Sequence, residues 1–190
     1  MVAEAALEAG VALSDVSRRD TFLRLISEYE SALRRLAGAY ADAPSDRDDL
    51  FQEIAVAVWR AIPRFRGESS ERTWLYRIAH NVAISSVARA ERREGKESLM
   101  PEEFEHPSPA LNAEQEILRA ERVRLLNQAI RELSITDRQI ILLHLEGLGY
   151  AEIEQVSGLS ESAIATRLSR IRERLREKIA IRRPTADEQS

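Results

Sequence analysis

Two basic segments of the sequence carry side chains whose chemistry suits nucleic acid. Residues 60–93 and residues 160–183 each contain eight basic and three acidic residues, so each segment carries +5. The first segment interleaves arginines with aromatic rings; such rings stack on unpaired bases while arginines lie along phosphates. The second places arginines at helical spacing, which suits contact with duplex phosphates. Both patterns favour binding to nucleic acid over catalysis.

Residues that could catalyse a reaction or bind a metal form no recognisable cluster in the sequence. The chain lacks cysteine, which excludes disulfides, thiolate zinc sites and a cysteine nucleophile. The histidines His80, His106 and His144 are far apart, and none forms an HxxxH or HExxH pair. No combination of acid, base and nucleophile is visible. We therefore expect no catalytic residues, no metal site and no cofactor.

Acidic residues are also sorted into segments, although the formal net charge of the whole chain is only −4. Residues 42–53 carry −4 and residues 94–116 carry −6. An acidic total argues against a nucleic-acid binder, but the sorting leaves both basic segments intact. In the first acidic segment, one helical face is predicted to dock on a basic partner; a solvated helix start that satisfies the helix dipole is the alternative. The residues of that face are Asp48, Asp49, Gln52 and Glu53.

The first basic segment starts with a polar, glycine-containing loop and continues into a predicted helix. The loop is 65–70, and its order of polar and aromatic neighbours suits unstacked single-stranded bases. The alternative is that Trp74 and Tyr76 are core residues of a helical bundle, and we expect this of at least one. The helix presents, in order, Arg72, Thr73, Trp74, Tyr76, Arg77, His80 and Asn81.

The second basic segment has the pattern of a DNA-binding helix-turn-helix. A short helical pattern ends at Gly158, Leu159 supplies an apolar plug, and Ser160 is a natural N-cap for the longer helix that follows. Small side chains near the start of that helix allow close approach to base edges. An ordinary corner of two helices with a solvated arginine face is the alternative. The exposed face is predicted to contain Ser162, Ala165, Thr166, Ser169 and the ladder Arg167, Arg170, Arg172, Arg174 and Arg176.

The spacing of apolar residues predicts an all-α protein. Apolar side chains recur at i, i+3, i+4 and i+7 in several segments, and no stretch alternates with the period of a useful strand. Helical spacing is present at 22–36, 50–62, 73–90, 117–133, 137–145, 150–156 and 160–179.

A proline-rich acidic stretch divides the chain into two helical halves. Three of the six prolines lie within residues 94–116, where the helical pattern fails. We expect a flexible linker there, joining small helical domains at 20–93 and 117–183. Residues 1–19 are expected to be an N-terminal extension, frayed before about Asp15.

No membrane-spanning or secretory segment is visible. No apolar run approaches the ~20 residues of a membrane span. The N-terminus is acidic before it is basic and lacks an apolar signal core. We therefore expect a cytoplasmic protein without membrane insertion.

In this order, across an acidic linker, the two basic segments resemble the extracytoplasmic-function (ECF) sigma factors of bacterial RNA polymerase. The resemblance covers about Thr21–Arg93 and Ala120–Ile179. DDLFQEIAVAVWR is similar to the core-polymerase-binding motif of sigma region 2, and FRGESSERTWLYRIAHN to the segment that melts the promoter and reads the −10 element. LSITDRQIILLHLEGLGYAEIEQVSGLSESAIATRLSRIRERLR is similar to region 4, which reads the −35 element.

The resemblance implies a role for each residue set. The face Asp48, Asp49, Gln52 and Glu53 would contact the clamp helices of the polymerase β′ subunit. The loop would form a pocket for a flipped −10 base, and Arg167, Arg170 and Arg174 would contact phosphates. The implied −10 residues are Arg66, Gly67, Glu68, Ser69, Ser70, Thr73, Trp74, Arg77, His80 and Asn81. The implied −35 residues are Ser160, Ser162, Ala165, Thr166, Arg167, Ser169, Arg170 and Arg174.

The resemblance also implies partners and a reaction that the chain itself does not catalyse. Such a subunit binds core RNA polymerase through its β and β′ subunits, reads promoter DNA and helps to open the duplex. An anti-sigma factor usually restrains it. The linker would follow the RNA exit region, where a charge of −6 could mimic RNA; a solvated spacer explains the same sequence.

Ala165 departs from the family pattern, because many members have Lys or Arg there. Arginine commonly reads guanine, whereas alanine can only touch a thymine methyl. The departure predicts a −35 preference that is shifted at that base.

Two other readings of the chain stay open at this point. A standalone helix-turn-helix regulator would bind duplex DNA alone, but it gives no reason for the basic aromatic segment at 65–81. A helical adaptor with merely solvated arginines would show no DNA effect from Arg167→Ala.

Overall fold

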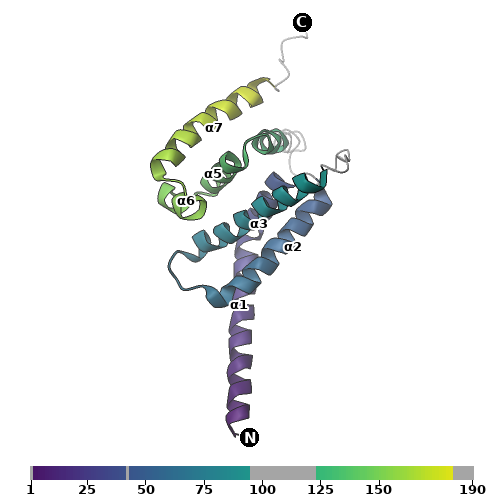
Figure 1. Ribbon diagram of the computed structural model, residues 1–190, viewed down its shortest axis with the longest axis vertical. Helices are drawn as coiled ribbons and strands as arrows, with labels where there is room; N and C mark the ends of the chain where they lie inside the picture. Colours follow the sequence, from purple (N-terminus) through teal and green to yellow (C-terminus); the bar gives the residue numbers. More distant parts are fainter. Residues whose placement is uncertain (1, 42, 95–122, 182–190) are drawn as a thin grey trace, which may run out of the picture.

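The computed structural model describes residues 2–41, 43–94 and 123–181. Within these ranges every regular element is a helix, which confirms the all-α class. The helices are α1 (Val2–Tyr40), α2 (Pro44–Ala61), the short 3-10 helix η1 (Ile62–Arg64), α3 (Glu71–Glu94), an unlabelled helix over 123–131, α5 (Ile135–Leu145), α6 (Tyr150–Ser157) and α7 (Glu161–Ile181) (Figure 1).

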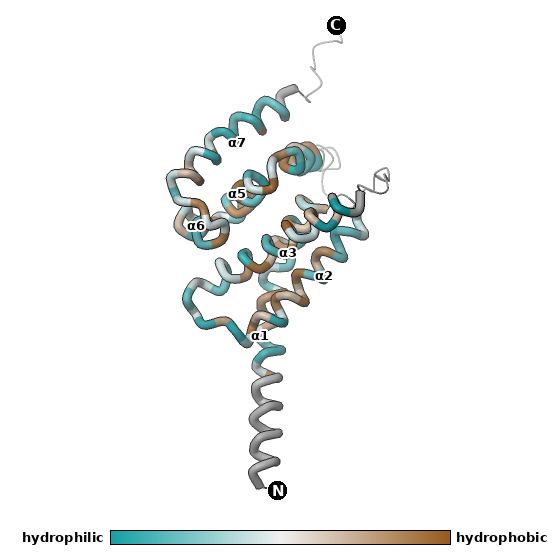
Figure 2. The backbone as a smooth tube through the Cα atoms, in the orientation of Figure 1, coloured by the Kyte–Doolittle hydropathy of each residue, from teal (hydrophilic) through white to brown (hydrophobic). Residues whose placement is uncertain are grey.

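The first half of the protein is a bundle of α1, α2 and α3. The predicted apolar stripes form its core: Leu25 and Leu33 of α1, Ile54 of α2 and Leu75 of α3 are almost fully buried. Along each helix, apolar residues are interspersed with polar ones, as expected for helices that bury one side (Figure 2). Proline sits within the first two positions of both α2 and η1, where its missing N–H has no helical partner to lose.

The second half is built from α5, α6 and α7, and it confirms the predicted helix-turn-helix. Gly158 has φ +74°, a left-handed conformation that ends α6 without steric cost. The Ser160 hydroxyl accepts the backbone N–H of Ala163 at 3.4 Å, as an N-cap does. The stripe of α7 that packs into the core is Ile164, Leu168, Ile171 and Leu175.

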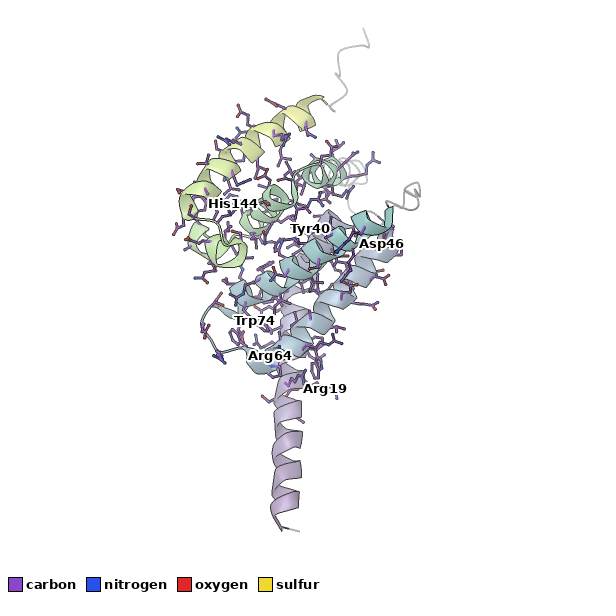
Figure 3. The ribbon with its side chains drawn as sticks, in the orientation of Figure 1. Arg19, Tyr40, Asp46, Arg64, Trp74 and His144 are labelled. Carbon is purple, nitrogen blue, oxygen red and sulfur yellow. The ribbon has the colours of Figure 1, made fainter. Side chains whose placement is uncertain are left out.

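The two halves lie against each other, with α5 and α6 next to α3 (Figure 1). Tyr40, at the end of α1, lies between α3 and α5 (Figure 3), and the Arg138 guanidinium of α5 is 5.4 Å from its ring centroid. No sequence pattern predicted this docking, because it depends on surfaces brought together from distant segments.

Two further expectations concern the N-terminal extension and the linker. The N-terminal extension was expected to fray before about Asp15, but α1 runs back to Val2. Its run of Ala, Glu and Leu explains this, since these residues have high helix propensity. The linker at 94–116 and the first residues of the helix expected from 117 lie outside the described residues, apart from Glu94 at the end of α3.

Candidate polymerase and DNA interface

The four residues of the predicted acidic face of α2 lie on two different sides of the helix. Asp49, Gln52 and Glu53 line a groove between α2 and α3. Asp48 lies on the other side, toward α1, where its carboxylate is 3.3 Å from the Arg34 guanidinium. The groove is therefore the surface that brings three of the four predicted residues together.

The same groove receives side chains from α3. Arg89 forms an ion pair with Glu53, so one of the acidic groups is already balanced by a cation. Asn81 also lines the groove, although the sequence grouped it with the −10 residues. It lies ten residues along α3 from Glu71, or about 15 Å at 1.5 Å per residue. Asn81 therefore shares a groove with three of the predicted polymerase-binding residues and lies about three helical turns from the start of α3.

The predicted −10 loop is exposed but firmly anchored at its end. Arg66, Gly67, Glu68 and Ser70 are exposed, while Ser69 is half-buried. Gly67 has φ +73°, so a side chain there would be strained even though the space around it is open. Ser70 closes the loop by accepting the Thr73 backbone N–H at 3.0 Å, which caps α3.

Aromatic packing holds this loop from below. The rings of Phe65 and Trp74 are 5.0 Å apart, which ties the loop entrance to the first turn of α3. Trp74 is 8% exposed and Tyr76 is 2% exposed. Both are therefore core residues, so the structure realises the core alternative for each ring. Arg77 of the same helix is exposed.

Three of the predicted −10 residues do not reach the surface. Thr73 is 3% exposed and His80 is 1% exposed, and Trp74 is buried as described. His80 has its Nδ1 atom 3.1 Å from the Tyr40 hydroxyl. Burial lowers the pKa of His80 to about 3, so its ring is neutral at pH 7. The structure thus places His80, one of the predicted −10 residues, inside the core of region 2 rather than on its surface.

The predicted −35 face of α7 is largely exposed. Ser162, Thr166, Ser169, Arg170 and Arg174 are exposed, and Ala165 is half-buried. The Thr166 hydroxyl donates to the Ser162 carbonyl at 3.0 Å, so its proton is already used. A groove beside this face also contains Leu133 and Asp137 from the segment before and within α5.

Arg167 differs from the other arginines of the ladder. Its Nη1 atom is 2.7 Å from the Asp137 carboxylate, which is only 20% exposed. Asp137 is therefore a residue of this surface that sequence reasoning missed, as is Arg89 in the α2–α3 groove. The one signal was the position of Asp137 three residues after Ser134, whose hydroxyl accepts its N–H; that pattern indicates a helix start rather than a DNA surface.

Comparisons with known proteins match both halves. Residues 25–93 match the family model "Sigma-70 region 2", and residues 124–175 match "Sigma-70, region 4". The chain is 32% identical over 168 residues to the ECF RNA polymerase sigma-E factor of Haemophilus influenzae, covering 85% of this chain and 88% of that protein. It is 30% identical over 165 residues to the Escherichia coli K12 sigma-E factor, with coverage of 83% and 86%.

Solved structures share the fold. Sigma factor RpoE in complex with the anti-sigma factor NepR from Bartonella quintana aligns with a TM-score of 0.66 at 23% identity, covering 86% of this chain and 99% of that one. CnrH in complex with the cytosolic domain of CnrY aligns with a TM-score of 0.62 at 23% identity, covering 87% and 91%.

The family follows from these matches, and the two domains correspond to sigma regions 2 and 4. None of the helices in the described ranges combines the length and the hydropathy of a membrane span. The relatives at 30% identity or more are matched over most of their own length. The chain therefore belongs to the ECF sigma factors, the RNA polymerase subunits that bind core polymerase and direct transcription initiation at specific promoters.

Proposed function

We propose that this sigma factor binds core polymerase through the α2–α3 groove and reads the promoter through two separate surfaces. The observation that carries this proposal is the division of the molecule: an acidic groove, an exposed glycine loop and an arginine-rich helix face lie at three different places. Sigma factors are non-enzymatic, so the polymerase performs the chemistry. The limits 20–93 and 117–183 for the two domains, and 94–116 for the linker, remain predictions.

The α2–α3 groove is the proposed contact for the clamp helices of the β′ subunit. Asp49 and Gln52 are exposed on the groove wall, ready to meet basic and polar groups. Glu53 is paired with Arg89, so it can exchange that partner for one on the polymerase without a net burial of charge. Asp48 is assigned a smaller role, because it faces α1 and Arg34.

The exposed loop Arg66–Ser70 is the proposed pocket for a flipped −10 base. Taking a base out of the stack costs a few kcal/mol, so capture is efficient only once the duplex opens. The Ser70 cap and the Phe65–Trp74 contact hold the loop before DNA arrives, which reduces the ordering cost of binding. Melting and recognition are thus one coupled event in this proposal.

The exposed face of α7 is the proposed reader of the −35 element. Ser162, Thr166 and Ser169 lie near its start or middle, and Arg170 and Arg174 follow at spacings that reach phosphates. Ala165 offers only a methyl group, which favours a thymine at the base it meets. A −35 preference shifted at that base follows from this side chain.

Two further partners belong to the proposal. Bartonella quintana RpoE is seen with the anti-sigma factor NepR and CnrH with CnrY, and we infer that a comparable inhibitor binds this chain. The linker at 94–116, which lies largely outside the described residues, is proposed to follow the RNA exit region because of its charge of −6.

Run-off transcription with core polymerase on a promoter library tests the proposal. Transcripts that depend on both core and this chain, from templates sharing −10 and −35 motifs, are expected. Tight, specific binding to those templates without polymerase, and no stimulated transcription, would contradict it and favour a standalone regulator.

A further inference from the structure

Three arginines on one side of α7 differ in their surroundings. Arg167, Arg170 and Arg174 recur at i, i+3 and i+7, and all three line the groove between α7 and the start of α5. The Arg167 guanidinium donates to the Asp137 carboxylate at 2.7 Å. Arg170 and Arg174 are exposed, and neither is paired with an acidic side chain of the described residues. One of the three positive charges is therefore balanced by α5 and two are not.

A second arginine of α7 also contacts α5, but without losing its charge. The Arg172 guanidinium donates to Nε2 of His144 at 2.6 Å. Burial, together with the Arg172 charge, lowers the pKa of His144 from its usual 6.5, so this ring is neutral at pH 7. The contact with His144 therefore directs an arginine, whereas the contact with Asp137 also cancels one.

The start of α5 holds Asp137 in place before DNA arrives. Asp137 lies in the first turn of that helix, and the Ser134 hydroxyl accepts its backbone N–H at 3.2 Å. A carboxylate in this position is favoured by the helix dipole. The Asp137 side chain is 20% exposed, against 41% for Arg167. Arg167 must therefore give up a charge-assisted hydrogen bond to a fixed, largely covered partner before it can bind a phosphate.

The number of arginines that reach phosphates determines how strongly a protein binds DNA and how steeply salt weakens that binding. Each phosphate neutralised by an arginine or lysine contributes about 0.9 to the slope of log affinity against log salt concentration on duplex DNA. Such contacts position the protein and carry no sequence information. An arginine that stays with a carboxylate of its own domain contributes little to either quantity.

We propose that Asp137 limits the affinity of region 4 for promoter DNA: it holds Arg167 and so keeps one positive charge of α7 from the phosphates, whatever the DNA sequence. This inference rests on the proposed −35 surface. Region 4 then binds DNA more weakly than the charge of +5 on residues 160–183 suggests. Stable promoter binding depends correspondingly more on base contacts and on core polymerase.

The variant Asp137→Asn tests this in the holoenzyme, with Glu177→Gln as its matched control. Each substitution removes one negative charge, and Glu177 is an exposed residue in the second half of α7. Binding is measured between about 50 and about 200 mM salt, on a duplex with the selected −35 element and on one with that element scrambled. Asp137→Asn is expected to bind both duplexes about fivefold more tightly at about 0.1 M salt, with a slope steeper by about 0.9. Glu177→Gln should keep the wild-type slope.

Two further variants show whether Asp137 acts through Arg167. In the Arg167→Ala background, Asp137→Asn should leave the slope unchanged, because no arginine is released. The conservative variant Asp137→Glu keeps the negative charge and should keep the wild-type slope. A steeper slope that persists in full in the Arg167→Ala background would mean that Asp137 repels phosphates directly, which overturns the inference.

A purely structural role for the pair makes a different prediction. Like charges at i, i+3 and i, i+4 destabilise a helix, so Asp137 could serve only to offset the repulsion between Arg167 and Arg170. Asp137→Asn would then lower the free energy of unfolding in urea and leave the salt slope of the folded protein unchanged. Partial loss of the fold weakens DNA binding, so misfolding cannot produce the tighter binding that we expect.

The outcomes separate this inference from the assignment of the −35 surface. An unchanged slope in Asp137→Asn overturns the inference, and so does a changed −35 sequence in run-off selection, because Arg167 would then read a base. Arg170→Ala tests the surface itself: if the holoenzyme's affinity for promoter DNA and its salt slope stay at the wild-type values in that variant, α7 is assigned wrongly. Weaker binding in Arg170→Ala together with tighter, sequence-independent binding in Asp137→Asn supports both.

Discussion

The surface proposed for the −35 element is one face of a single helix, whereas the surface proposed for the −10 element combines a loop with the first turns of α3. On α7 the core stripe and the DNA face are separate, so Ser162 and Ser169 are exposed while Leu168 is buried. On α3 the support is buried, and Trp74 and Thr73 are largely covered. Substitutions on the exposed face of α7 therefore leave the core intact, whereas substitutions of the buried residues Thr73 and Trp74 also disturb the fold.

The strongest way to break this comparison is to truncate one residue on each surface. Trp74→Ala removes a buried ring that packs on Phe65 and should lower the free energy of unfolding by about 3–5 kcal/mol. Ser169→Ala on exposed α7 should change it by less than about 0.5 kcal/mol. Denaturant unfolding measures both. Equal costs for the two substitutions would show that the −10 support is not part of the core.

Charge reversal in the α2–α3 groove tests whether a third surface exists apart from both DNA surfaces. Asp49→Arg with Glu53→Arg should weaken binding to core polymerase by at least about 100-fold, because like charges across an interface cost several kcal/mol. Asp48→Arg, on the side that faces Arg34, should have a smaller effect. Fluorescence anisotropy with labelled sigma factor and core enzyme gives both affinities, and circular dichroism checks the fold. Core binding that survives the double reversal means the groove is assigned wrongly.

The buried histidine of region 2 predicts that the stability of the fold depends on pH. The unfolded chain binds a proton at His80 with a pKa near 6.5, whereas burial lowers the folded pKa to about 3. Protons therefore favour the unfolded chain below pH 6.5, and stability falls as the pH drops toward the folded pKa. Between pH 7.5 and pH 5 this contributes a loss of about 2 kcal/mol at 1.36 kcal/mol per pH unit.

The variant His80→Gln separates the contribution of His80 from that of the carboxylates, which also take up protons as the pH falls. Its stability is expected to depend less steeply on pH than that of wild type between pH 7.5 and pH 5. Parallel curves from urea unfolding at the two pH values would mean that His80 takes up its proton in the folded state as well.

The smallest predicted effect is a difference between two arginines of the −35 surface in how much each contributes to the salt dependence of DNA binding. Arg170→Ala should weaken −35 duplex binding for all sequences and reduce the salt slope by about one. Arg167→Ala should reduce the slope by less, because Asp137 already neutralises Arg167 at 2.7 Å. The holoenzyme's affinity for promoter DNA at several salt concentrations measures the slopes. Identical slopes for the two variants would show that the Asp137 pair breaks on DNA.

The −35 surface could be predicted from the sequence more fully than the −10 surface. The face of α7 could be predicted because periodicity within one helix determines which side is buried, and Gly158 and Ser160 mark its turn and cap. The burial of His80 could not, because it depends on Tyr40 from the end of α1 and Tyr76 from its own helix. The pairs Arg35–Glu146 and Arg167–Asp137 join segments that are distant in sequence, so no local pattern indicates them.

Separate selection at the two promoter elements tests the division of labour most directly. Run-off transcription is carried out with core polymerase on one library randomised at −10 and another randomised at −35. Arg66→Ala, in the exposed loop, should change only the selected −10 sequence, and Ala165→Arg should change only the −35 sequence, toward guanine at one base. An Ala165→Arg holoenzyme that selects the wild-type −35 sequence, or a loop variant that alters −35 selection, would contradict the account.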